Sequence, residues 1–115
     1  MLTDLSPRRV FLRTGVTDMR KSIGTLSILV QGEMGMDPFA ESLYVFCNRE
    51  RAIIKILYWE RNGFCLWMKR LEKERFRWPE TKKEVEEIGR EELGWLLNGL
   101  DISKAHAKLN FSSVI

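Results

Sequence analysis

Two cations stand in the stretch TGVTDMRKS, residues 14–22, where the pattern predicts the start of a helix. Asp18 suits the cap position, because its carboxylate can accept hydrogen bonds from the first free amides of a helix. Arg20 and Lys21 follow it, where positive charge opposes the helix macrodipole. Free amides and two cations together form a site suited to phosphate. The structural alternative is that Asp18 is only a cap and the cations pair with acidic neighbours on the surface.

A second group of cations lies in the hairpin predicted by the dipeptide Asn62-Gly63. If this dipeptide forms the two-residue loop, Lys55 lies opposite Arg70, and a three-residue loop places Lys55 opposite Lys69 instead. Like charges in opposite positions cost free energy unless an anion lies between them. Both registers therefore predict a place that favours an anion.

Basic and aromatic side chains alternate just beyond the hairpin, where Arg75 and Arg77 are interleaved with Phe76 and Trp78. Such a stripe can hold a phosphate backbone, with exposed aromatic rings available to stack on bases. The alternative is that the rings belong to the core and the cations form a solvated rim. The candidate nucleic-acid-binding residues are Arg20, Lys21, Lys55, Lys69, Arg70, Arg75 and Arg77.

Catalytic patterns are weak by comparison. The sequence contains no glycine-rich phosphate loop and no Gly-x-Ser-x-Gly elbow, and His106 is its single histidine. Cys47 and Cys65 lie in apolar runs, where a free cysteine behaves as a small hydrophobic residue, so we expect no disulfide. With one histidine and no Cys-x-x-Cys, the chain does not supply the ligands of a zinc site. We predict that the protein is not an enzyme and has no cofactor or metal. The least favoured alternative is a two-metal nuclease that uses Asp18, Glu60 and Asp101.

The composition is that of one globular domain: 115 residues, 44% hydrophobic and 10% aromatic. We expect a single domain over residues 1–115, with a core at about 8–102 and a C-terminal tail at 103–115. The sequence has no run of eighteen apolar residues and no charged-then-apolar leader, which predicts a cytoplasmic protein with no membrane partner.

Charge is distributed unevenly along the chain, which carries a net +3. Residues 1–79 hold fourteen Lys/Arg and nine Asp/Glu, whereas residues 80–115 hold five and seven. A basic surface in the first two thirds favours an anionic partner such as DNA.

Hydrophobic periodicity predicts an α+β fold. It consists of a curled antiparallel meander of about four to five strands, with one helix after the first strand, a C-terminal helix, and both helices on one face. The expected strands are residues 8–13, 43–48, 52–60, 64–71 and 75–78, and the expected helices are residues 19–32 and the charged segment 80–102.

As a set, four segments resemble the TnpB-like accessory proteins of the bacterial insertion sequence family IS66, over roughly residues 8–102. In order they are TDMRKS, DPF followed by LYVFCNR, IKILYWERNGFCLWMKRLEKERFRWP and ELGWLLNGLDI. One departure is Tyr58-Trp59-Glu60, where Trp-Trp-Asp is common in the family, and it weakens the case for an acidic role at Glu60.

The resemblance implies a small cytoplasmic protein that is encoded beside a larger transposase and is needed for transposition. We therefore expect a non-enzymatic accessory factor that binds DNA, the transposase, or both. The alternative is an interaction module that pairs with the transposase or with itself and has no DNA binding of its own.

Overall fold

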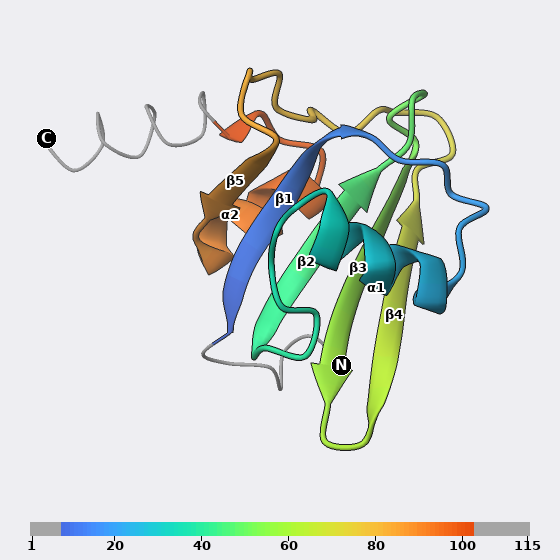
Figure 1. Cartoon of the computed structure of the whole chain (residues 1–115). Coiled ribbons are helices and arrows are strands. Elements are labelled where there is room, and N and C mark those ends of the chain that lie inside the picture. Colours follow the sequence, from blue (N-terminus) through green and yellow to red (C-terminus); the bar gives the residue numbers. More distant parts are fainter. Residues whose placement is uncertain (1–7, 103–115) are drawn as a thin grey trace, which may run out of the picture.

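The computed structural model of the chain describes residues 8–102 (Figure 1). The predicted tail, residues 103–115, lies outside this range. The described residues form five strands and two helices, in the order β1 (Arg9–Val16), α1 (Ile23–Gly32), β2 (Ser42–Cys47), β3 (Ile53–Glu60), β4 (Gly63–Arg70), β5 (Val85–Ile88) and α2 (Arg90–Leu97). Within the described range, no helix combines the length and the apolar character needed to cross a bilayer.

The strands form one open sheet in the order β4-β3-β2-β1-β5. β2, β3 and β4 are antiparallel neighbours, as a meander requires, but β1 and β2 are parallel. The prediction of an entirely antiparallel sheet was therefore wrong. Parallel neighbours need a crossover connection, and α1 supplies it between β1 and β2.

Alternation along the strands produces two cores, one on each face of the sheet. α1 covers the first face, where Leu26 and Val30 pack against Tyr44 and Phe46. α2 covers the second face through Leu93 and Leu96. The helices thus lie on opposite faces, and the prediction that both cover one face was wrong. The central strand β2 is buried on both sides, so each face needs its own cover.

The segment 75–78 was predicted as a strand but has no strand partner. Phe76 and Trp78 are 1% and 7% exposed, and both pack into the core on the α2 side of the sheet. The Phe76 N–H donates to the carbonyl of Arg51 (2.7 Å), and the Trp78 indole N–H donates to the carbonyl of Thr14 (3.1 Å). The alternation of basic and aromatic residues therefore reflects packing of an extended segment against the domain.

The last strand lies in a stretch that was predicted to be helical. β5 pairs antiparallel with β1, with Val85 opposite Arg13 and Ile88 opposite Val10. Helix α2 begins only at Arg90, after Gly89, whose N–H donates to the Glu92 carboxylate (2.9 Å). Four residues are too few for periodicity to separate a strand from a helical turn.

Candidate nucleic-acid interface

Three connecting segments lie at the end of the sheet where β1, β2 and β4 finish (Figure 1). They are residues 17–22, 48–52 and 71–84, and together we call them the basic end. The N–H of Thr17 bonds the carbonyl of Cys47 (2.9 Å), and the Phe76 N–H bonds the carbonyl of Arg51 as described above. These segments contain nine Lys/Arg and six Asp/Glu, so the basic end carries net positive charge.

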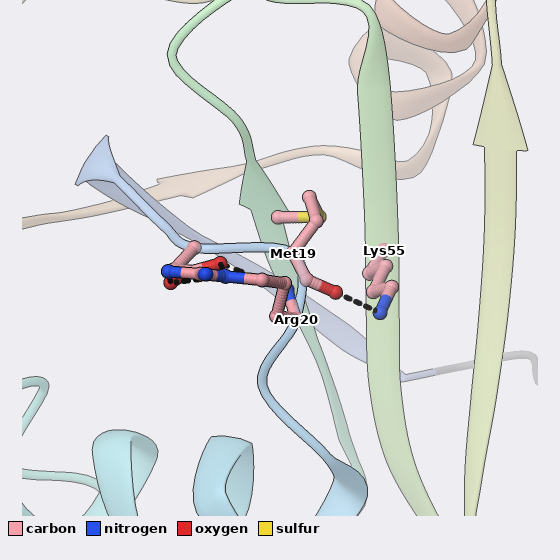
Figure 2. A network of polar contacts seen from close by, with 4 residues as sticks. Met19, Arg20 and Lys55 are labelled. Carbon is pink, nitrogen blue, oxygen red and sulfur yellow. Dashed lines mark hydrogen bonds and ion pairs between the residues drawn. The ribbon is translucent and has the colours of Figure 1, made fainter.

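Two residues of the TDMRK motif anchor its loop to the domain. Thr17 is 1% exposed, and its hydroxyl oxygen accepts a hydrogen bond from Nη1 of Arg13 (3.1 Å). Met19 packs its side chain onto the core beneath α1. Its carbonyl oxygen accepts a hydrogen bond from Nζ of Lys55 on β3 (2.6 Å; Figure 2). The loop is therefore attached to the sheet at two positions, Thr17 and Met19.

Asp18 and Arg20, between and after these anchors, face the solvent. The Asp18 carboxylate accepts from the Arg20 N–H (2.9 Å) and from the Arg20 guanidinium (2.8 Å at Nη2). These bonds lower the pKa of Asp18 to about 2. The Arg20 side chain is still 91% exposed, and it points away from Lys55 (Figure 2). Arg20 can therefore reach a partner in solution although it is paired.

Asp18 does not cap the helix, contrary to the prediction. The N-cap is Ser22, whose Oγ accepts from the N–H of Thr25 (3.4 Å), and α1 begins at Ile23. Arg20 and Lys21 thus precede the helix, and the predicted charge conflict in its first turn does not exist. Lys21 makes no ion pair within residues 8–102.

The register of the hairpin also differs from the prediction. Glu60 lies opposite Gly63, so the turn consists of Arg61 and Asn62, with a positive φ of 52° at Arg61. Lys55 faces Met68, and the like-charge pairs predicted for the hairpin do not form.

The three hairpin cations have separate environments. Lys55 bonds the Met19 carbonyl on the α1 side, whereas Lys69 lies on the α2 side and its Nζ bonds the carbonyl of Leu97 at the end of α2 (2.8 Å). Both ammonium groups are thus bonded to backbone carbonyls within the fold. Arg70, on the α1 side at the end of β4, pairs with Glu72 (3.0 Å) and lies at the border of the basic end.

Arg75 and Arg77 are exposed because Phe76 and Trp78 point inward. Neither arginine has a hydrogen bond or ion pair from its side chain in the described chain. The same is true of four cations at the basic end that sequence reasoning missed, namely Arg49, Lys73, Lys82 and Lys83.

Arg49 shows what signal could have found these residues. It sits at the tip of a turn in which Asn48 Oδ1 accepts from the N–H groups of Ala52 and Ile53 (2.9 and 3.0 Å). Asn before a charged pair is a turn signal, and a turn projects its tip into solvent. Arg49 and Arg20 line one open hollow of about 580 Å³.

The aromatic residues do not offer bases a stacking surface at this end. Trp78 is buried, Trp67 packs against the core on the α2 side, and Trp59 contacts Phe39 and Phe64 with ring centroids 5.0 Å away in each case. The alternative in which these rings belong to the core and its border is the one observed.

The residues of the imagined nuclease are not brought together. Asp18 lies at the basic end, whereas Glu60 lies at the opposite end of the sheet beside the hairpin turn. No group of three or more metal-binding side chains occurs in residues 8–102.

Cys47 and Cys65 are both free thiols, and burial raises the pKa of Cys47 to about 12. His106 lies outside the described residues.

Comparison with known proteins identifies a family and two relatives that are similar to this chain. A family model described as "IS66 Orf2 like protein" matches residues 8–107. The uncharacterized protein y4hO of Sinorhizobium fredii is 36% identical over 93 residues, 81% of each chain. The uncharacterized protein y4jC of the same organism is 28% identical over 100 residues, 87% of this chain and 86% of the relative. No solved structure matches.

Proposed function

The chain belongs to the IS66 Orf2-like protein family of insertion-sequence accessory proteins, and from this premise we propose that it assists transposition by binding DNA through the basic end. The observation that carries the proposal is a group of cations there that make no ion pair within residues 8–102. Three of them, Arg49, Arg75 and Arg77, are exposed, and Lys21 is half-buried. A phosphate can contact these four side chains without the loss of an ion pair seen in the described chain. Arg20 and Arg70 are paired on the surface, where an ion pair is weak and exchanges readily.

The proposed contact is with the phosphate backbone of duplex DNA. Neutralising phosphates releases condensed counterions, which gives affinity without reading bases. Unspecific single-strand binding relies instead on aromatic rings that stack on bases, and no exposed aromatic ring supports that mode at the basic end. Lys55 and Lys69 contribute less in this proposal, because their ammonium groups already bond backbone carbonyls.

We further propose that the protein acts without catalysis, beside the transposase encoded by the same element. The basic end occupies one end of the domain, so bound DNA would leave the two sheet edges and the outer surface of α1 open to a protein partner (Figure 1).

The test is a DNA titration at several salt concentrations, with element-end DNA and unrelated DNA. A variant with Lys21→Ala, Arg49→Ala, Arg75→Ala and Arg77→Ala should bind more weakly. The slope of log K against log salt should become shallower by about 0.9 for each lost phosphate contact. Reversing charge with Arg20→Glu and Lys21→Glu should act in the same direction.

The matched control changes exposed cations that lie away from the basic end. Arg61→Ala at the hairpin turn and Arg90→Ala at the start of α2 also remove exposed positive charges that make no ion pair in the described part of the chain. Binding should be close to that of the unchanged protein. The basic-end variant loses four positive charges and the control loses two, so equal losses of affinity per charge removed would assign the affinity to net charge alone. An unchanged affinity in the basic-end variant would contradict the proposal.

A further inference from the structure

Strand β4 presents a free edge. It is the outermost strand beside β3, and no other strand of residues 8–102 pairs with it. Just past its end, the N–H of Leu71 bonds the carbonyl of Ala52, which shows that odd-numbered residues point their backbone groups toward β3. The even-numbered residues point theirs outward, and these are Phe64, Leu66, Met68 and Arg70.

The two edges of the sheet are built differently. β5 is four residues long and has two adjacent glutamates, features that protect an edge from further pairing. β4 is eight residues long, and its charges are confined to Lys69 and Arg70 at one end. Exposed apolar side chains accompany it: Met68 is 55% exposed, and Phe39, in contact with the Phe64 ring, is 56% exposed. The β4 edge is thus the unprotected one.

We propose that β4 pairs antiparallel with β4 of a second copy of the chain. The charges along the strand select this occupant and this direction. In an antiparallel pair, the basic end of each strand lies beside the uncharged end of the other. A parallel pair in near register would bring the Lys69–Arg70 ends of both strands together, which is unfavourable.

The register follows from the same residues. Centring the two-fold axis on Trp67 places Leu66 opposite Met68 and Phe64 opposite Arg70, where a guanidinium can lie over a ring. All the outward backbone groups of the central residues then find partners, and no like charges are opposite each other. Because β5 is protected, β4 pairs with itself, and the interface closes as a dimer with no route to a filament.

The dimer has a consequence that rests on the proposed function. The two copies run in opposite directions, so their basic ends lie at opposite ends of the joined sheet. One dimer would then hold two separate DNA segments. Measuring dimer formation without DNA distinguishes failure of the dimer from failure of DNA binding.

Sedimentation velocity over a range of protein concentrations tests the interface. The unchanged protein should pass from monomer to dimer, and Met68→Lys should raise the dimer dissociation constant by about tenfold or more. Ile28→Lys is the matched control, because Ile28 is 68% exposed on α1 and receives the same charge away from β4. A monomer at every concentration, or equal weakening by both variants, would overturn the proposal.

Disulfide trapping tests the register. In a Cys65→Ser background, Trp67→Cys should form a covalent dimer on mild oxidation, since Trp67 lies on the axis and Cys47 is 1% exposed. Circular dichroism verifies that this variant is folded, and Met68→Lys in the first experiment decides the question independently if it is not. If the protein stays monomeric and binds the transposase through β4, the proposal that a second copy pairs with this edge is wrong.

Discussion

The ammonium group of Lys55 on β3 donates a hydrogen bond of 2.6 Å to the carbonyl oxygen of Met19 in the loop before α1. The two residues are far apart in sequence, and the contact joins the central sheet to the segment that presents Arg20 and Lys21. A cation that was predicted to bind phosphate thus holds the loop on which two other candidate cations stand.

Replacing Lys55 should loosen this loop. Lys55→Met removes a charged, partly buried hydrogen bond, so the free energy of unfolding should fall by about 1–3 kcal/mol. Amide hydrogen exchange should accelerate in residues 17–22. Lys82→Met is the control, because Lys82 is exposed and has no side-chain partner in residues 8–102. Equal stability changes in urea denaturation would show that the bond does not hold the loop.

The Asp18 carboxyl should titrate with a pKa of about 2 in the folded protein, because the Arg20 side chain bonds its charged form. Arg20→Ala should return this pKa toward 3.8, measured by NMR of the carboxyl carbon. The folded pKa is lowered, so the pair stabilises the protein above the unfolded pKa and loses this effect as pH falls toward 2. Lys21→Ala should shift the pKa of Asp18 much less, since Lys21 is the weakest of its causes. A pKa unchanged in Arg20→Ala would contradict the pairing.

Lys69 should stabilise the end of α2. Its Nζ donates a hydrogen bond to the carbonyl of Leu97, one of the last carbonyls of the helix. A positive charge at this end of a helix also interacts favourably with the helix macrodipole. Lys69→Met should lower the free energy of unfolding by about 1 kcal/mol or more and increase hydrogen exchange of the Asn98 and Gly99 amides. DNA affinity should change little. A loss of DNA affinity at unchanged stability would instead assign Lys69 to phosphate binding.

The hairpin turn offers a test of register. Arg61 has a positive φ, which costs a side-chain-bearing residue free energy that glycine does not pay. Arg61→Gly should therefore raise the free energy of unfolding, by up to about 1 kcal/mol. Asn62→Gly should not, because Asn62 is not among the described residues with positive φ. If thermal denaturation showed that Asn62→Gly stabilises the protein and Arg61→Gly does not, the result would support the predicted Asn62-Gly63 loop instead.

Much of the fold could be predicted locally. The stripe of Leu26 and Val30 gave helix α1 to within a few residues, and apolar alternation located β2, β3 and β4. The hairpin was expected, but its turn lies one residue earlier than the Asn-Gly signal predicted. A local turn preference is worth little beside the packing of two eight-residue strands, which chose the register.

The segment 75–78 and strand β5 show where local patterns fail. Alternation of Arg75 and Arg77 with buried rings is identical for a paired strand and for an extended segment that packs on one side. The Glu-rich segment around β5 resembles a solvated helix until β1 is available as a partner. In each case the presence or absence of a strand partner distant in sequence determines the structure.

For the candidate site, the sequence by itself determined which residues are basic, that they are concentrated in the first two thirds of the chain, and that they alternate with apolar residues. Only the tertiary structure decided which cations remain available. Lys55 and Lys69 bond backbone carbonyls more than 25 residues away, whereas the side chains of Lys21, Arg75 and Arg77 have no hydrogen-bond partner within residues 8–102. The physical reason is that a charge pattern has no information on distant acceptors, and those acceptors come into reach only when the sheet pairs and the helices pack.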